Sequence, residues 1–224
     1  GLAPVWLGGA VDPDSKAVAD FITLAGMRRF LNGDLPLPAD LVPPTDLFDH
    51  DPRVGVGIDV EALVSEEGIL YTTSFLALAP GVALYAEIDA PEEVASKLEH
   101  APVRFGGEGR RVVVRQIDAI AGGVPAWSVA PAGDRQLVVS ISPGSYDRAL
   151  PAMFRDRIRA ASVGRPWAHS GWDATLGGPR PTRQQAPAGS VWFVQGDVPR
   201  GRSLSATEEE AARGEGLFLT GVWQ

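Results

Sequence analysis

The chain of 224 residues contains no cysteine, which excludes disulfides and thiolate metal sites. Its three histidines, His50, His100 and His169, are well separated and show no metal-ligand spacing. No apolar run approaches the roughly 20 residues that a membrane helix needs, and no signal peptide is visible. These absences predict an intracellular, cytoplasmic protein that holds no metal and no other cofactor.

Motifs of the common enzyme classes are also missing. The sequence has no G-x-S-x-G elbow, no P-loop and no dinucleotide-binding fingerprint. His50-Asp51 forms an H-D dipeptide, but the other histidines of a metal phosphohydrolase are not evident. His169, beside Ser170, is a candidate general acid-base for RNA cleavage, because a single histidine can serve that role. A packed or exposed histidine on a strand is the simpler interpretation, and we predict that the protein is not an enzyme.

Lysine is scarce, and the charge is unevenly distributed. Residues 1–100 carry five basic and 17 acidic residues, and they include the only lysines, Lys16 and Lys97. Residues 101–224 carry 15 basic residues, all arginine, and 11 acidic ones. The local net charges are therefore −12 and +4, in keeping with the formal net charge of −8. Arginine suits bidentate phosphate contacts and stacking on bases, although a high-GC codon bias also explains its abundance.

The first half of the sequence predicts two helices and several strands. Apolar spacing predicts a helix over 15–32, capped by Asp14 or Ser15 and ended by Asn32-Gly33. The proline-rich segment 34–52 is typical of an extended connector. Ala79-Pro80-Gly81 predicts a type II turn between two strands, and a helix is expected over 91–99. The expected strands are 53–59, 70–78 and 82–90.

The second half predicts the order β-α-β-β-α-β, the split βαβ order of a ferredoxin-like fold. The expected elements are strand 135–142, helix 145–162, strands 164–173 and 189–197, helix 206–213 with a Ser205–Glu208 capping box, and strand 217–223. A loop rich in proline and arginine, 174–188, joins the middle strands. Residues 53–118 supply part of a second such unit, whose first elements are expected to precede Gly1. The predicted fold class is α+β, with tandem ferredoxin-like (RRM-like) domains of antiparallel sheets.

Four segments in a specific order and spacing resemble one protein family. They are SEEGILYTTSFLAL (65–78), VRFGGEGRR (103–111), the stretch from HSGWD to FVQGD (169–197) and the glycine-rich ending GEGLFLTGVW (214–223). Together they resemble the RAMP (repeat-associated mysterious protein) subunit three of the type III-B CRISPR effector, the Cmr complex. The resemblance covers most of the chain from about residue 50 onward.

The resemblance implies a non-catalytic RNA-binding subunit with two RAMP domains, here 1–130, with its start missing, and 131–224. Such subunits grip the 5′ handle of the crRNA, dock onto the large polymerase-like subunit and begin the stacked backbone of RAMP subunits in this antiviral complex. An acidic first half would then face a protein neighbour and the arginine-rich half the RNA. The alternatives are a RAMP endoribonuclease that processes guide precursors through His169, the equivalent subunit of a type III-A or III-D complex, and a protein scaffold without RNA contact.

Glycines, arginines and an aromatic residue make up the expected RNA-binding set. Bare backbone amides at glycines attract phosphates, and an aromatic ring offers a flat face to an unstacked base. The set comprises Gly106, Gly107, Gly109, Arg110, Arg111, Trp172, Arg180, Arg183, Gly214 and Gly216. Because side chains alternate along a strand, only one of Arg110 and Arg111 faces the RNA from within it. The simpler interpretations are a plain hairpin turn at 106–109, a core position for Trp172, and close packing of the last strand at the glycine tail.

Overall fold

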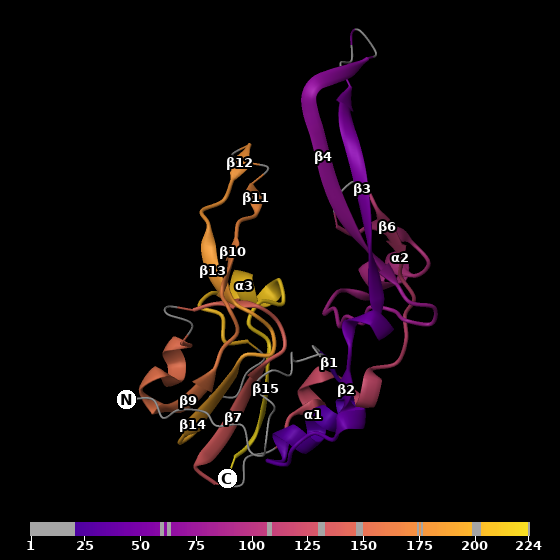
Figure 1. The fold of residues 1–224 in the computed structure, drawn as a ribbon. Coiled ribbons are helices and arrows are strands. Elements are labelled where there is room, and N and C mark those ends of the chain that lie inside the picture. Colours follow the sequence, from indigo (N-terminus) through magenta and orange to yellow (C-terminus); the bar gives the residue numbers. More distant parts are fainter. Residues whose placement is uncertain are drawn as a thin grey trace. The chain divides into compact units, whose positions relative to one another are not determined.

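We describe a computed structural model of the chain. It covers residues 21–58, 61, 64–106, 109–129, 133–146, 150–173, 175, 177–198 and 203–223. These residues form two compact units, one of 21–29 with 35–85 and the other of 30–34 with 86–223 (Figure 1). Short helices and small antiparallel sheets make up both, so the predicted α+β class is confirmed. The domain boundary expected at residue 130 stays a prediction.

Two searches concern only this described part of the chain. None of its helices is long and apolar enough to cross a membrane. None of its His, Asp and Glu side chains gather in groups of three that could hold a metal ion.

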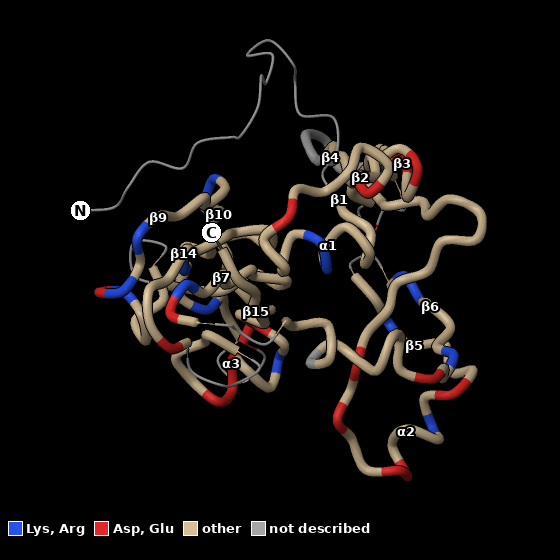
Figure 2. Tube along the Cα trace, turned by 90° about the horizontal axis from the view of Figure 1, so that it is seen from below, with Lys and Arg blue, Asp and Glu red and all other residues tan. Residues whose placement is uncertain are grey.

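Acidic and basic residues are distributed unequally between the units. Residues 35–85 contain eight acidic residues and one basic residue, Arg53. In the other unit, arginines lie on the hairpin of β5 (Pro102–Arg104) and β6 (Arg111–Val113), and glutamates on α3 (Glu208–Ala212). Figure 2 shows these residues as blue and red segments of the trace. Negative charge is therefore concentrated in the unit that contains 35–85.

A strand stands where the N-terminal part of a helix was expected. Phe21–Ile22 forms β1 and pairs antiparallel with β2 (Leu41–Val42), and α1 begins only at Leu24 and ends at Leu31. Thr23 caps α1, since its hydroxyl accepts a hydrogen bond from the Gly26 amide at 3.1 Å. The helix prediction was wrong at 21–22, and residues 15–20, with the expected caps at 14 and 15, lie outside the described residues.

The proline-rich segment after α1 is more structured than a simple connector. It contains β2 and two short 3₁₀ helices, η1 (Pro38–Asp40) and η2 (Pro44–Asp46). The buried Asp40 organises it, because its carboxylate accepts a hydrogen bond from the Leu37 amide at 2.9 Å and lies 3.4 Å from Arg29 Nε. The segment 34–52 was therefore only partly predicted, and its last residues belong to the next strand.

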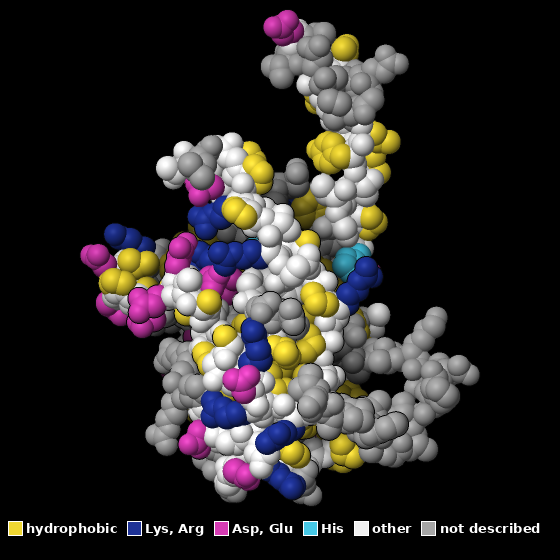
Figure 3. All heavy atoms as spheres, turned by 90° about the vertical axis from the view of Figure 1, so that its left-hand side faces the viewer, with side chains coloured by type: hydrophobic (Ala, Val, Ile, Leu, Met, Phe, Trp, Pro, Cys, Tyr) yellow, Lys and Arg dark blue, Asp and Glu magenta, His cyan; other side chains and the backbone are white. Residues whose placement is uncertain are grey.

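A long hairpin dominates the unit that contains 35–85. β3 (Phe48–Ile58) and β4 (Ser65–Leu78) pair antiparallel from Phe48 opposite Leu78 to Val56 opposite Leu70, where the register shifts. Figure 3 shows hydrophobic side chains along this hairpin. β3 starts five residues earlier than the strand predicted at 53–59.

The strand predicted at 82–90 does not form. The turn before it does form, with Gly81 at φ 82° and the Val82 amide donating to the Ala79 carbonyl at 3.0 Å. β4 pairs with the preceding strand β3 instead, so 82–90 receives no ladder of hydrogen bonds. After it, α2 (Glu92–Leu98) confirms the expected helix, with Glu92 and Glu93 at its positive N-terminal end.

The second unit contains a four-stranded antiparallel sheet in the order β15-β7-β14-β9. The strands are β7 (Arg135–Ser140), β9 (Ile158–Ser162), β14 (Val191–Gln195) and β15 (Phe218–Val222). Counted along the chain, the order in the sheet is fourth, first, third, second. Three of the strands confirm predicted ones, whereas β9 was expected to be helical.

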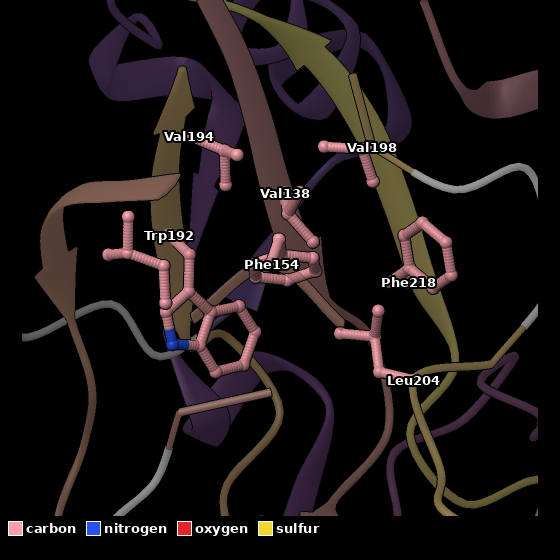
Figure 4. Close-up of a cluster of buried hydrophobic side chains, with 8 residues drawn as sticks. Val138, Phe154, Trp192, Val194, Val198, Leu204 and Phe218 are labelled. Atoms are coloured by element: carbon pink, nitrogen blue, oxygen red, sulfur yellow. The ribbon is translucent and has the colours of Figure 1, made fainter. Parts of the chain in front are cut away.

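The helix predicted at 145–162 is wrong, and the hydrophobic core explains why. Residues Ala152–Arg157 form a 3₁₀ segment, η6, broken at Phe154, whose φ is −139°. This break buries the Phe154 ring beside Trp192, 6.4 Å away between centroids (Figure 4). Ile158, also buried, then pairs with Val194 in β14. Burial of two aromatic rings and a strand pairing outweigh the helical spacing of the sequence.

The segment 164–188 forms a narrow ribbon rather than one strand and a loop. β10 (Trp167–His169) pairs with β13 (Arg183–Ala186), and β11 (Trp172–Asp173) pairs with β12 (Gly178–Pro179). Between the pairs, three residues on one side, 180–182, oppose two on the other. Such a bulge accommodates Pro181, which has no amide for a ladder. The end of the ribbon is fixed by β8 (Gly144–Ser145), which pairs with β13.

The cap of the last helix differs from the predicted capping box. Thr207 is the N-cap of α3, and its hydroxyl accepts a hydrogen bond from the Glu210 amide at 3.2 Å. Ser205 instead donates its hydroxyl to the Glu215 carbonyl at 2.8 Å. The serine is therefore used to hold the segment that follows the helix.

We predict that Gly221→Ala destabilises the protein, because strand β15 approaches the backbone of Leu31 there. A methyl group on Gly221 would meet the Leu31 carbonyl oxygen at 2.3 Å and its Cα at 2.6 Å. The loss in unfolding free energy should be about 2 kcal/mol, measured by chemical denaturation. Gly171→Ala is the matched control, since its methyl would meet only Arg180 Cδ at 3.7 Å. Equal stability of the two variants would contradict the prediction.

Candidate nucleic-acid interface

Two arginines face each other across the β5–β6 hairpin. Arg104 pairs directly with Arg111, so the two side chains lie on the same face of the ribbon. Both are exposed. Like charges directly opposite each other destabilise a strand pair, whereas an anion between them would remove the repulsion.

Arg110 belongs to the other face of the same hairpin. Its carbonyl accepts a hydrogen bond from the Phe105 amide at 3.0 Å, which continues the ladder beyond the Arg104–Arg111 pair. Alternation therefore places Arg110 opposite in direction to Arg111, as the sequence predicted. The partner that Arg111 does have on its face, Arg104, was missed. The symmetry of the sequence about Gly107-Glu108 was the signal that could have found it.

The glycines between the two strands require their special backbone. Gly106 and Gly109 have φ values of 80° and 66°, a region that favours glycine. A methyl group on either would meet nothing within 4 Å, so both positions border open space. Gly107 lies outside the described residues. The segment is a hairpin turn, and its exposure is compatible with a backbone approached by an anion.

Two tryptophans of the ribbon are exposed. Trp172, on β11, is 68% exposed, and Trp167, on β10, is 53% exposed. The expectation of a core position for Trp172 is therefore wrong, while Trp192 is fully buried. An exposed indole ring offers a stacking surface for an unpaired base. Trp167 was not among the candidates, although its place in the same ribbon gives it the same opportunity.

The ribbon arginines are paired with acidic residues of α3. Arg183 forms an ion pair with Glu210, whose side chain is only 4% exposed. Arg180 lies 3.6 Å from Asp173 through Nε and 3.6 Å from Glu209 through Nη1. Neither arginine stands on a free loop, as the sequence had suggested.

Removing Arg183 would leave a buried carboxylate without its cation, which is more costly than losing an exposed ion pair. Arg183 therefore has a structural role in holding the ribbon against α3. Its neighbours extend the network, since Arg213 pairs with Glu209 and Glu215, and Gln185 donates to Glu215 at 3.3 Å. The α3 glutamates are the partners that sequence reasoning missed.

The amides of the glycine tail are engaged within the protein. The Gly214 amide donates to the Ala211 carbonyl at 2.9 Å, and the Gly216 amide donates to the Pro143 carbonyl at 2.8 Å. The Gly216 carbonyl in turn accepts from the Leu204 amide at 2.8 Å. These bonds fix the tail beside 143–146 and 203–205. In this arrangement neither amide points to an external anion.

Tyr146 supports the tail from beneath. Its ring packs edge-on against Trp192, with centroids 5.7 Å apart, and a methyl group on Gly216 would meet its hydroxyl at 2.9 Å. Burial raises the pKa of the Tyr146 phenol to about 12, and the negative charges of Glu210 and Glu215 add to this effect. The phenol is therefore held in its neutral form.

The expected binding residues fall into two groups. Trp172, Arg180 and Arg183 lie on the ribbon, and Gly214 and Gly216 follow α3, which pairs with that ribbon. Gly106, Gly109, Arg110 and Arg111 lie on the β5–β6 hairpin. A single groove shared by both groups stays a prediction.

Two chains of solved structures are similar to this one. The first, from "Cryo-EM structure of the Type III-B Cmr-beta bound to cognate target RNA", has 19% identity over 66% of this chain and 46% of its own, with a TM-score of 0.43. The second, from the same complex with cognate target RNA and AMPPnP in state 1, has 18% identity over 70% and 49%, with a TM-score of 0.44. This chain spans about half the length of these structural relatives. No curated protein matches it.

Residues 10–223 match the family described as CRISPR-associated protein (Cas_Cmr3). The match extends over nearly the whole sequence, and the chain belongs to this family. The resemblance to the RAMP subunit three of the type III-B CRISPR effector, which rested on three segments and a glycine-rich tail, is thereby confirmed. Membership supports the role of a type III-B effector subunit.

We predict that Arg183→Met lowers stability and that Arg111→Met does not. Loss of Arg183 strands the buried Glu210 carboxylate, which should cost about 2 kcal/mol after allowance for the exposure of the arginine. Arg111 is exposed on β6, so its change should stay within about 0.5 kcal/mol. Urea denaturation measures both, and adding Glu210→Gln to the Arg183→Met chain should restore part of the loss. If Arg183→Met were as stable as the wild type, the structural role of the pair would be refuted.

The raised pKa of Tyr146 predicts a specific loss of stability in alkali. The folded pKa of about 12 exceeds the ordinary value of 10.0, so the neutral phenol is favoured by folding. This contribution is complete below pH 10 and is lost as the pH rises through 12. Between these values, unfolding free energy should fall more steeply for the wild type than for Tyr146→Phe. Parallel profiles for the two proteins would exclude the proposed burial effect.

Proposed function

We propose that the chain is a non-catalytic RNA-binding subunit of a type III-B CRISPR effector, which grips the 5′ handle of the crRNA. In this role it docks the large polymerase-like subunit and adjoins the backbone RAMP subunits in antiviral defence. Family membership supports the effector assignment. The single observation that favours RNA contact is the exposed Arg104–Arg111 pair beside two open glycines.

The proposed fold is a pair of ferredoxin-like RAMP domains, 1–130 and 131–224. The sheet order β15-β7-β14-β9, with β9 and β14 adjacent and antiparallel, is consistent with a split βαβ arrangement in the second domain. The 3₁₀ segment η6 takes the place of the first helix, and α3 is the second. The equivalent subunit of a type III-A or III-D complex would share this arrangement.

The arginine pair suits a phosphate better than a base. Two guanidinium groups on one strand face can each donate two hydrogen bonds to phosphate oxygens, and a dianionic or monoanionic group offsets their repulsion. Gly106 and Gly109 leave the backbone beside the pair unobstructed. Trp172, 68% exposed, is the proposed platform for an unstacked base. Because Arg180 and Arg183 are paired with α3, we assign the charge-dependent part of binding mainly to the hairpin.

We predict that Arg104→Ala with Arg111→Ala weakens binding of a labelled guide RNA roughly tenfold at moderate salt. The variant should also show a shallower decline of affinity with ionic strength, because fewer phosphate contacts release fewer counterions. Fluorescence anisotropy over a salt series measures both quantities. Arg159→Ala with Arg165→Ala is the matched control, since these arginines are also exposed and the change in net charge is the same.

Equal losses in the two double variants would mean that only net charge matters and would contradict a site on the hairpin. Incubation with repeat RNA tests the catalytic question, because His169 is exposed on β10 opposite Arg183. Cleavage that is abolished by His169→Ala would favour a guide-processing endoribonuclease instead.

A further inference from the structure

One face of the β3–β4 hairpin carries an exposed apolar stripe. The stripe consists of Val54, Val56, Leu70, Leu76 and Leu78, which are 67%, 50%, 70%, 59% and 40% exposed. The register aligns them, because it pairs even-numbered residues of both strands and side chains alternate along each strand. The same face contains no Asp, Glu, Lys or Arg from 48 to 56 or from 70 to 78.

The opposite face is different because its side chains cover one another. The Tyr71 ring lies over Gly55, where a methyl group would meet it at 2.4 Å. Arg53 lies over the Phe75 ring at 5.5 Å from its centroid and pairs with Asp51 at 2.6 Å. One face of this two-stranded sheet is thus internally packed, and the other presents apolar groups to solvent. Contiguous exposed apolar side chains of this kind mark interaction sites.

Charge narrows the kind of partner. The unit that bears the stripe has eight acidic residues and one basic residue between 35 and 85. RNA would be repelled by this excess, and a second copy of the chain would bring the same negative charge. A protein surface with an apolar centre and lysines or arginines around it satisfies both the stripe and its surroundings.

We propose that the apolar stripe docks a basic-flanked apolar segment of another protein subunit, an inference that rests on the proposed role of the chain in a multisubunit effector. The stripe supplies the desolvated centre of the contact. The surrounding carboxylates orient the partner and disfavour both nucleic acid and self-association. A two-stranded sheet gains stability when one of its faces is covered, which is consistent with a hairpin of this length completing its packing on assembly.

Site-specific photocrosslinking tests the proposal in the type III-B effector reconstituted from its subunits and guide RNA. A benzophenone side chain is placed at Leu70 in the stripe or at Leu84, a matched leucine of the same unit that is 63% exposed outside the hairpin. Position 70 should crosslink to a protein subunit several-fold more than position 84. Mass spectrometry should find lysine or arginine beside the captured apolar segment.

Crosslinks from position 70 that disappear with ribonuclease, that join two copies of this chain, or that do not exceed those from position 84 would overturn the proposal. A captured segment flanked by acidic residues would do the same. In parallel, Val56→Thr with Leu70→Thr should weaken incorporation into the complex on the order of tenfold, and Leu84→Thr should not. Failure of the unaltered chain to enter the complex would instead count against the proposed function itself.

Discussion

Strand β14 is the element on which the second unit depends, because it pairs with β7 on one side and β9 on the other. Its Trp192 is fully buried and meets both Tyr146 and Phe154 edge-on. Burial of these rings requires the chain to leave the helical conformation at Phe154, and β9 can then join the sheet. The same packing holds Tyr146 beneath the glycine tail. One aromatic cluster thereby connects the sheet to the segment that follows α3.

Charge is used in two ways in that unit. On the ribbon, Arg180 and Arg183 are neutralised by α3, and the buried Glu210 makes one of these pairs structural. On the β5–β6 hairpin, Arg104 and Arg111 instead face each other. An arginine count cannot separate these cases. The difference decides which arginines are suited to an external phosphate, and it favours the hairpin over the ribbon as the main anionic contact.

The other unit presents a different surface, apolar on one hairpin face and acidic around it. This combination suits a protein better than RNA, whereas the arginine hairpin suits RNA better than protein. A subunit that bridges a guide RNA and protein neighbours needs both kinds of surface. Their separation on two compact units agrees with the −12 and +4 balance of the sequence, although the local charge that matters lies in 35–85 and at four or five specific arginines.

By itself, the sequence determined the α+β class, the hairpin turn at 106–109, three strands of the central sheet, helix α2 and the family, because these depend on turn residues, local periodicity and ordered motifs. Only the tertiary structure decided that 158–162 is a strand, that Thr207 caps α3, that Arg183 pairs with Glu210 and that Arg104 opposes Arg111. Each of these joins residues through packing or pairing that local propensity does not encode. Strand partners and ion pairs are chosen by the burial of the whole unit, which is why they could not be read from short stretches.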